Sequence, residues 1–393
     1  MPLEPPEDAA TFLRSAQEFW TRVKHEKAKT PLPQGEWYPF DTLSGLSTVT
    51  ELVSSDYAAL ARDIAGLPVA DLGCADGDLG LLFASWGAEV DAIDYAPNNY
   101  NRMQGVAALS SALGLAIGIH DIDLDRDFQL PREVYGLALF LGTLYHLKNP
   151  YAVLERLAFQ TRWCVLSTRI AQVTPSGLAR VESEPVAYLA DGREIANDAT
   201  NFWIFSAAGL LRILQRTRWA IVASKRVGCL ADSNPIDGNA DERMFVLVKS
   251  RAHFPGLEVR LEDGWHAIEG SYRWTHKRFS LGIVLPLEKP FTGFSLDLFI
   301  APALVASRQP LTVSCRIRDQ VVGRSQYSES GPVEFSGHLP PFALHEPVLK
   351  LDFTVQSEYS PAAGDARELG ICVPIEPATG QVRFQLRNDP SRI

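Results

Sequence analysis

The chain reads Val69-Ala70-Asp71-Leu72-Gly73-Cys74-Ala75-Asp76-Gly77-Asp78-Leu79-Gly80 at the stretch that decides its fold. An apolar run is followed by closely spaced small residues and then by a helix-compatible run from Leu79 to Ala84. This order predicts a buried parallel strand, a tight turn and a helix that begins at the turn. Gly73 and Gly77 leave room for a ligand to lie against the backbone, where a larger side chain would collide.

Two kinds of ligand site and a purely structural turn are the alternatives for this stretch. A dinucleotide site is typical of G-x-G-x-x-G, whose third glycine lets the helix pack closely beneath a pyrophosphate. Here Ala75 and Asp78 occupy the second and third glycine positions, and Asp71 precedes the first. Acids repel a pyrophosphate and attract a cation, so the turn favours a cationic ligand.

The pattern D-x-G-x-A-x-G over residues 71–77 resembles motif I of the class I S-adenosylmethionine-dependent methyltransferases, whose ligand carries a sulfonium and an ammonium group. The resemblance implies a methyltransferase with S-adenosyl-L-methionine as cofactor and S-adenosyl-L-homocysteine (SAH) as product. The candidate cofactor contacts are Asp71, Gly73, Cys74, Ala75, Gly77, Asp94, Tyr95, Asp121, Ile122, Leu141 and Tyr38.

Two further strands are expected to end in acids at the same sheet edge. The strand 88–95 contains Asp94, which lies about twenty residues beyond the glycine turn, where a carboxylate can accept hydrogen bonds from both ribose hydroxyls. A solvated strand-end acid is the alternative. A third strand over 115–119 leads into Asp121 and Ile122; the resemblance implies that Asp121 accepts from the adenine amine and that the Ile122 N–H reaches the ring.

A fourth strand, 136–141, is apolar throughout, as expected of a strand that is covered on both faces. It leads to Tyr145 and His146, after which Asn149 caps a helix that has Pro150 at its first position. We expect Tyr145 and His146 to lie over the methyl-donor end, and the ordinary pKa of imidazole makes His146 the candidate general base. Alternatively, the pair only shapes the donor pocket. His120 is a weaker candidate for the base because it lies on the adenine side.

Three segments suggest a branch within the class: 37–41, 144–150 and 201–206. Together with motif I they resemble the tRNA wobble-uridine carboxymethyltransferase-like bacterial proteins over about residues 35–250. That branch uses a lysine before motif I to bind the additional carboxylate of its donor. The aligned stretch Trp37-Tyr38-Pro39-Phe40-Asp41 has no lysine, which favours ordinary S-adenosylmethionine.

At 393 residues the chain is too long for one ordinary core. We expect an N-terminal helical and aromatic extension over 1–50, a doubly wound, Rossmann-like α/β methyltransferase domain over 51–250, and an all-β sandwich over 251–393. A helix over about 50–65 should lead into the first strand. In the last part apolar residues recur at every second position, the pattern of half-buried strands. These runs are 279–285, 294–300, 311–317, 349–355 and 382–386.

Two tryptophans, Trp265 and Trp274, are the most distinctive residues of the predicted sandwich. Such aromatic side chains can stack on sugars, and the pattern is similar to β-modules appended to bacterial glycan-assembly enzymes. The alternative is that both indoles belong to the core of the sandwich.

Composition restricts the partners and the compartment. A net charge of −10 counts against a nucleic-acid partner. The five cysteines are scattered, without a C-x-x-C pair, so we expect free thiols in a reducing cytoplasm and no metal site. No apolar run is long enough to span a membrane. The oligomeric state is left open.

Three functions follow from these observations. The first is O-methylation of a small molecule or of a bacterial glycan or sugar acceptor, favoured by the acidity and by the sandwich. The second is modification of the tRNA wobble uridine, favoured by the branch resemblance but opposed by the charge and by the missing lysine. The third is a non-catalytic binding protein on a methyltransferase scaffold.

Overall fold

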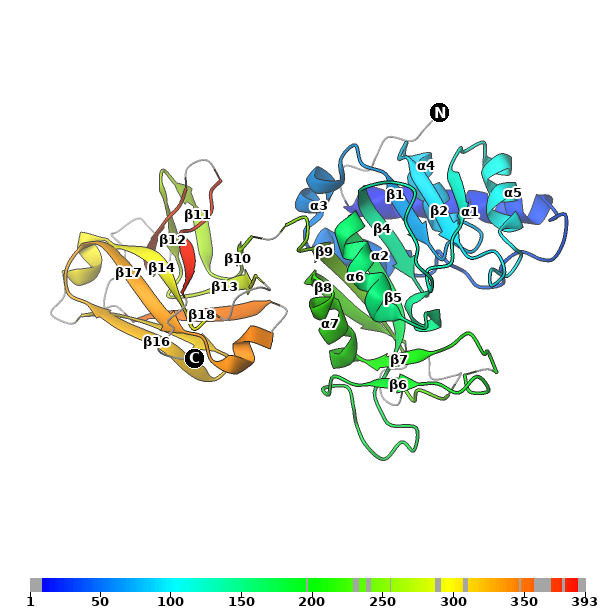
Figure 1. Cartoon of the computed structure of the whole chain (residues 1–393). Coiled ribbons are helices and arrows are strands. Elements are labelled where there is room, and N and C mark those ends of the chain that lie inside the picture. Colours follow the sequence, from blue (N-terminus) through cyan, green and yellow to red (C-terminus); the bar gives the residue numbers. More distant parts are fainter. Residues whose placement is uncertain are drawn as a thin grey trace. The chain divides into compact units, whose positions relative to one another are not determined.

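The computed structural model describes residues 9–195, 197–228, 233–237, 242–254, 256–286, 291–306, 310–345, 348–356, 369–376 and 379–387. Contacts divide the chain into two compact units, Met1–Pro255 and Gly256–Ile393 (Figure 1). The first unit alternates strands and helices, and the second consists mainly of strands. Among the described residues, no helix is both long and apolar enough to cross a membrane.

A seven-stranded arrangement forms the centre of the first unit. Its strands are β1 (Val69–Leu72), β2 (Val90–Asp94), β3 (Gly118–Asp121), β4 (Tyr135–Leu141), β5 (Thr161–Ala171), β8 (Trp219–Val227) and β9 (Arg243–Ser250). They lie in the order β3-β2-β1-β4-β5-β9-β8, with the first five parallel and β9 antiparallel to both neighbours. This confirms the predicted doubly wound sheet, whose strand order reverses between β1 and β4.

Helices cover both faces of this sheet (Figure 1). On one face lie α1 (Ala9–Lys29), α2 (Leu46–Ser54), α3 (Tyr57–Ile64), α4 (Asp78–Ser85) and α5 (Gln104–Leu113), and on the other α6 (Pro150–Gln160) and α7 (Ala207–Arg216). Alternate residues of β4 serve the two faces: Leu137 and Leu139 pack under the first group, Ala138 and Phe140 under the second. The apolar strand is thus buried on both sides, as its sequence predicts.

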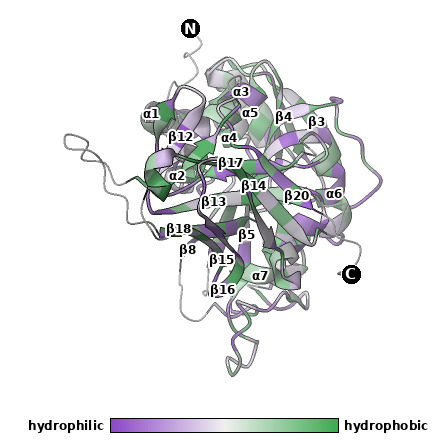
Figure 2. Cartoon of the chain, turned by 90° about the vertical axis from the view of Figure 1, so that its left-hand side faces the viewer, coloured by the Kyte–Doolittle hydropathy of each residue, from purple (hydrophilic) through white to green (hydrophobic). Residues whose placement is uncertain are grey.

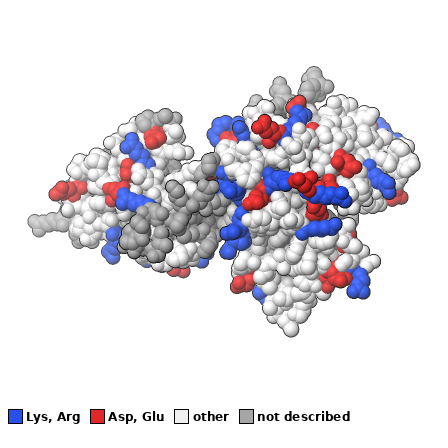
Figure 3. Space-filling model, in the orientation of Figure 1, with Lys and Arg blue, Asp and Glu red and all other residues white. Residues whose placement is uncertain are grey.

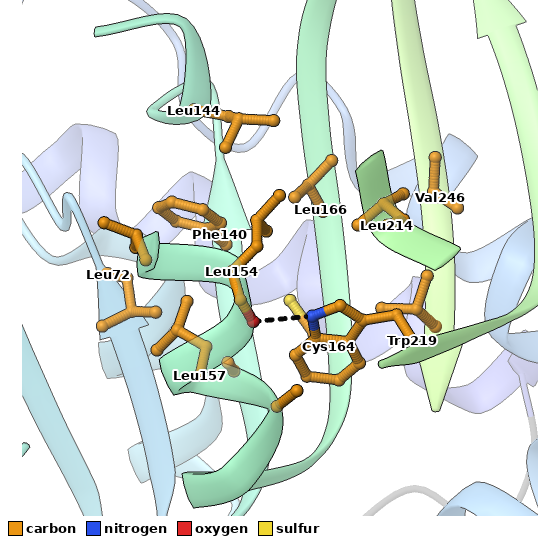
Figure 4. Packing of buried hydrophobic residues seen from close by; sticks show 14 of the residues in the cluster. Leu72, Phe140, Leu144, Leu154, Leu157, Cys164, Leu166, Leu214, Trp219 and Val246 are labelled. Atoms are coloured by element: carbon orange, nitrogen blue, oxygen red, sulfur yellow. Dashed lines mark hydrogen bonds between the residues drawn. The ribbon is translucent and has the colours of Figure 1, made fainter. Parts of the chain in front are cut away.

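The core beneath α6 and α7 is closed by Trp219 at the start of β8. Its indole N–H donates a hydrogen bond of 3.0 Å to the Leu154 carbonyl oxygen of α6, so this buried polar group is satisfied (Figure 4). Asn149 caps α6 as predicted, with its side chain accepting from the Ala152 N–H. A further small sheet extends from β5, which pairs in parallel with β7 (Trp203–Ser206); β7 pairs with β6 (Ala187–Leu189).

Two local predictions differ from the structure. The helix expected over 50–65 is two helices, α2 and α3, because the Ser54 and Ser55 hydroxyls donate to carbonyls of the preceding turn and compete with helix continuation. The third strand begins at Gly118 rather than at 115. Leu115 follows the C-cap of α5, where Gly114 has a φ of 66° and the Leu115 N–H donates to the Ser110 carbonyl oxygen.

The second unit is a β-sandwich, as predicted. One antiparallel sheet has the order β10-β13-β18-β15-β16, and the other β11-β12-β19-β14-β17 with β20 beside β14. The strands are β10 (Glu258–Leu261), β11 (Trp265–Glu269), β12 (Tyr272–Thr275), β13 (Arg278–Val284), β14 (Gly293–Ile300), β15 (Leu311–Ile317), β16 (Gln320–Tyr327), β17 (Gly331–His338), β18 (Leu349–Gln356), β19 (Cys372–Pro374) and β20 (Phe384–Arg387). Two short 3-10 helices, Pro302–Val305 and Pro341–His345, accompany them.

The two sheets share one core, built from the alternating apolar positions that the sequence shows. Phe279 and Leu281 of one sheet and Phe294 and Leu296 of the other are all buried in the same cluster. Figure 2 shows hydrophobic and hydrophilic residues succeeding one another along the strands of this unit. The alternation of apolar and polar residues therefore reflects one face of each strand turned to the core and one turned outward.

The tryptophans of the sandwich contribute to its core. Trp265 packs edge-on against Phe279, at 5.1 Å between ring centroids, and its indole N–H donates to the Ser280 carbonyl oxygen. Trp274 is half-buried against the same cluster. This geometry favours the core interpretation of these residues over stacking on a sugar.

Candidate active site

The loop after β1 lies where the strand order reverses. In open α/β sheets the connections on the two sides of such a point diverge, and ligands bind in the crevice beyond the carboxyl ends of the strands. Three residues of this loop have positive φ: Gly73 at 67°, Ala75 at 50° and Gly77 at 77°. Positive φ is costly for alanine, and strained residues of this kind cluster at functional sites.

The two glycines of the loop are required by the packing of the protein itself. A Cβ on Gly73 would lie 2.2 Å from the Thr143 hydroxyl oxygen, which follows β4. A Cβ on Gly77 would lie 2.5 Å from a methyl group of Val106 on α5. The packing of neighbouring side chains therefore already excludes a side chain at these two positions, and a ligand that approaches the backbone there remains a prediction.

Asp94, at the end of β2, joins this loop to the rest of the sheet edge. Its Oδ2 accepts hydrogen bonds from the Ala75 N–H at 3.0 Å and from the Asn99 side-chain amide at 2.8 Å, and its Oδ1 accepts from the Tyr95 N–H at 2.8 Å. Burial raises the pKa of Asp94, although these three donors oppose the shift. A carboxylate has about four acceptor positions, so three internal donors leave room for about one more.

Asp71 faces the helix that follows the loop. It is buried, and its Oδ2 accepts from the Gly80 N–H in the first turn of α4 at 2.9 Å. Burial raises the pKa of Asp71 to about 7. This carboxyl group therefore uses one of the donors that a helix N-terminus would otherwise offer to an anionic ligand.

Two further acids, Asp76 in the loop and Asp78 at the start of α4, share one ion-pair partner, Lys27, near the end of α1. The Lys27 ammonium lies 2.8 Å from Asp76 Oδ2 and 2.9 Å from Asp78 Oδ1, and all three side chains are largely buried. Asp76 also accepts from the Tyr38 N–H, and Asp78 from the Thr42 hydroxyl. The segment before β1 is thus fastened to motif I by buried charge-assisted hydrogen bonds.

Tyr38 lies on the segment between α1 and α2 and faces the sheet edge. Burial raises the pKa of Tyr38, and the charges of Asp94, Asp76 and Asp198 raise it further, while Arg243 opposes them. The groups that act on Tyr38 belong to the end of β2, the start of β9, the loop after β1 and the loop that contains Asp198. Its ring meets those of Phe40 and Tyr100 edge to face.

The end of β3 differs in one respect from the resemblance-based prediction. The Ile122 N–H, expected to reach the adenine ring, donates instead to the Asp94 carbonyl oxygen at 2.8 Å. Asp121 Oδ1 accepts from the Ala96 N–H at 2.9 Å, and the side chain is exposed at the sheet edge. A ring contact from Ile122 would therefore require its present hydrogen bond to break.

His146 lies in a 3-10 turn, η1 (Leu144–His146), directly after β4. Its Nδ1 is 3.1 Å from the Thr200 carbonyl oxygen, and its ring lies 4.1 Å from that of Tyr145. Burial lowers the pKa of His146, although the Thr200 bond and the charges of Asp198 and Asp94 oppose the shift. The ring is therefore neutral near pH 7 and able to accept a proton. Tyr145 packs against Ala171, Ile195 and Ile204.

The remaining predicted residues surround this edge in different ways. The Cys74 side chain is buried against Ala92 of β2 and against Met103 and Val106 at the start of α5. Tyr95 and Leu141 are half-buried at the ends of β2 and β4. His120 Nε2 lies 3.0 Å from Asp91 Oδ1, within a cluster that includes Arg132 and Tyr135.

Among the described residues, the thiols and possible metal ligands form no second site. Four cysteines are buried and form no disulfide: Cys74, Cys164, Cys315 and Cys372. Cys229 lies outside the described residues. Burial raises the pKa of the Cys372 thiol to about 12, which makes it a poor nucleophile. In the described part of the chain, no group of three or more histidines, cysteines or acids is placed to hold a metal ion.

Sequence reasoning missed Lys27, Asn99, Thr200 and Asp198. Lys27 is 49 positions before Asp76, and Thr200 is 54 positions after His146, so no local spacing links these partners. The only available signal for Lys27 was that Asp76 and Asp78 flank a buried turn, because buried acids require a cation. Nothing in the sequence indicated which cation supplies it.

Comparison with known proteins finds no matching family model and no matching curated protein. Solved structures that match include the N-terminal domain of EvdMO1 with SAH bound, at 17% identity and a TM-score of 0.36 over 60% of this chain and 96% of that one. Magnesium protoporphyrin IX methyltransferase from Synechocystis PCC 6803, also with bound SAH, matches at 20% identity and a TM-score of 0.35, over 59% and 94%. The [4+2]-cyclase SpnF matches at 12% identity and a TM-score of 0.37, over 64% of this chain and 98% of that one. At these low identities and TM-scores, the likeness does not assign a function to this chain.

Proposed function

We propose that this chain is a class I S-adenosylmethionine-dependent methyltransferase that methylates a hydroxyl group of a small molecule or glycan. The observation that carries the proposal is the convergence of three features at the strand-order reversal. These features are the strained loop after β1, the Asp94 carboxylate that holds it, and His146 beyond β4.

The residues present fit a cationic cofactor better than a dinucleotide. The first turn of α4 already gives a backbone donor to Asp71, and Asp76 and Asp78 border the same loop. A pyrophosphate would meet acids and few free donors there. The backbone of residues 73–77 and the remaining acceptor position of Asp94 would hold the cofactor, Asp94 through a ribose hydroxyl.

The chemistry needs one proton acceptor from the protein. When bound, S-adenosylmethionine supplies an activated methyl group for in-line displacement, so the protein contributes mainly alignment. A hydroxyl acceptor must lose its proton as its oxygen attacks. His146 is neutral near pH 7 and takes that proton, while Tyr145 is packed so that it orients the His146 ring.

The acceptor class is supported by charge. The chain carries a net charge of −10, and Figure 3 shows acidic and basic side chains interspersed on one face of the first unit. A phosphate backbone is bound best by a continuous basic surface. Lys27, which lies before motif I, is already paired with Asp76 and Asp78, so it does not serve a carboxylated donor.

Donor binding and methyl transfer test the proposal in two steps. Calorimetry with SAH and the full chain should show saturable binding. The chain is then incubated with methyl-labelled S-adenosylmethionine and separate pools of cell RNA, nucleotide sugars and polysaccharides. We expect label in a sugar or small-molecule pool. Label in RNA alone would favour the wobble-uridine alternative, and no SAH binding would contradict the methyltransferase assignment.

A further inference from the structure

A chain of hydrogen bonds connects His146 to an acid on a distant loop. His146 Nδ1 lies 3.1 Å from the carbonyl oxygen of Thr200 and 3.0 Å from its hydroxyl oxygen. That hydroxyl donates to Asp198 Oδ1 at 2.6 Å, and the Thr200 N–H donates to the same oxygen at 2.9 Å. The imidazole, the threonine and the carboxylate therefore form one connected group.

The loop that carries Asp198 and Thr200 is fastened to η1. The Phe202 N–H donates to the Tyr145 carbonyl oxygen at 2.8 Å, and the Trp203 indole donates to the Lys148 carbonyl oxygen at 3.1 Å. Asn201 is buried, and its amide donates to the Asp198 carbonyl oxygen at 3.2 Å. These bonds hold Thr200 at a defined position beside His146, so its contact with the ring is built into the fold.

The arrangement selects one protonation form of the ring. Because the Thr200 hydroxyl hydrogen is used by Asp198, both Thr200 oxygens present lone pairs to His146 Nδ1. A ring nitrogen that faces two acceptors makes favourable contacts only when it carries a hydrogen. The hydrogen bond at one ring nitrogen therefore decides whether the other nitrogen of the neutral ring is protonated. With Nδ1 protonated, Nε2 is the nitrogen that remains able to accept a proton.

We propose that Asp198 and Thr200 are positioning residues that hold His146 in the Nδ1–H form, so that Nε2 is the base of the methyl-transfer reaction. This inference rests on the proposed methyltransferase function for the use of the base, but the protonation form itself can be measured without a substrate. Neither positioning residue needs to touch the acceptor.

The charges around His146 set the direction of the expected effects. Asp198 from the loop and Asp94 from β2 both raise the pKa of His146, against the lowering effect of burial. Tyr38 is within electrostatic range of both acids and of Arg243 at the start of β9. Replacement of Asp198 by asparagine keeps the shape but removes one of the two charges, so the His146 pKa should fall further.

The experiment is nitrogen-15 NMR of the full chain with labelled histidine. The chain has eight histidines, and His146→Asn, or His146→Gln if the first variant folds poorly, identifies the signal of His146. The parent, Asp198→Asn, Thr200→Val and Thr200→Ser are titrated. Asp191→Asn is the matched control, because Asp191 is exposed and paired with Arg193. Thermal unfolding checks that each variant is folded.

We expect the parent to show Nδ1 protonated and Nε2 unprotonated above its titration. Asp198→Asn and Thr200→Val should lower the apparent pKa of His146 by roughly one pH unit, whereas Thr200→Ser and Asp191→Asn should match the parent. An Nε2–H form in the parent, or an unchanged pKa in Asp198→Asn, would overturn the inference. Calorimetry with SAH on the same samples keeps the two proposals apart, because absent binding contradicts the methyltransferase function and leaves the protonation result valid.

Discussion

At the scale of single residues, the acids of the candidate site differ in how much hydrogen-bonding capacity remains. Asp71 is buried against the backbone of α4, whereas Asp94 has three internal donors and one acceptor position left. Asp94 therefore combines two roles, since it holds the strained Ala75 and can still accept from a ligand. The charge of the same carboxylate also raises the pKa of His146.

Replacement of Asp94 by alanine tests the first of these roles. The variant should lose about 1–3 kcal/mol of SAH affinity, the usual cost when buried polar partners are left unpaired. Calorimetry measures this change, and Asp191→Ala serves as the exposed acidic control. Affinity equal to that of the parent would place the ribose contact elsewhere.

His146→Asn tests the base. If His146 accepts the proton, the variant should lose about two to four orders of magnitude in turnover with the identified acceptor, while SAH affinity changes little. Because the pKa of His146 is lowered from its ordinary value of 6.5, the parent should lose activity only as the pH falls below that value. The neutral ring is the active form, so the loss follows protonation.

The pH–rate profile of the same variant distinguishes the two interpretations of His146. A base predicts that the acidic limb disappears in His146→Asn. A structural role predicts weaker SAH binding, a lower melting temperature and an acidic limb like that of the parent. A retained acidic limb with normal SAH binding would contradict the base assignment.

At the scale of elements, the site is assembled by α1 and the segment that follows it as much as by the sheet. Phe12, Ala16, Phe19 and Val23 are buried on α1 at the three- to four-residue spacing of one helix face. Lys27 on the same helix forms ion pairs with Asp76 in the loop after β1 and with Asp78 at the start of α4. The helix therefore links the packing of the N-terminal segment to the position of the loop after β1.

Lys27→Met should be strongly destabilising, because it leaves Asp76 and Asp78 buried without their cation. Removal of one partner from a buried ion pair typically lowers the free energy of unfolding by about 3–5 kcal/mol. Denaturant unfolding measures this change, with Lys24→Met as control because Lys24 is exposed and lies 3.9 Å from Asp41. If the two variants were equally stable, the ion pair would have no structural role.

At the scale of the whole molecule, two units with separate cores follow one another along the chain. Among the described residues, the core of the sandwich is built from residues after 256, and the clusters around the α/β sheet from residues before 255. Every residue of the candidate site belongs to the first unit. We infer that the sandwich is not needed for cofactor binding.

A truncated chain of residues 1–255 tests this inference. It should unfold cooperatively and bind SAH with an affinity within about threefold of the full chain, a difference of less than 1 kcal/mol. Circular dichroism establishes folding, and calorimetry measures affinity. A folded fragment that does not bind SAH would show that the second unit completes the site.

The sequence by itself determined the doubly wound sheet, the sandwich and the location of the turn after β1. These features depend on hydrophobic period and on turn residues, which act over a few positions along the chain. It also placed Asp94 and His146 at strand ends, because parallel strands bring their carboxyl ends to one edge.

Only the tertiary structure decided the partners of these residues. Lys27 with Asp76, and Asp198 and Thr200 with His146, are pairs separated by tens of positions, and hydrogen bonds and ion pairs depend on distances in space. Packing also decided that Gly73 faces Thr143, and a competing hydrogen bond decided that the Ile122 N–H is occupied. Hydrophobic periodicity encodes which face of an element is buried, but not which polar atom it meets there.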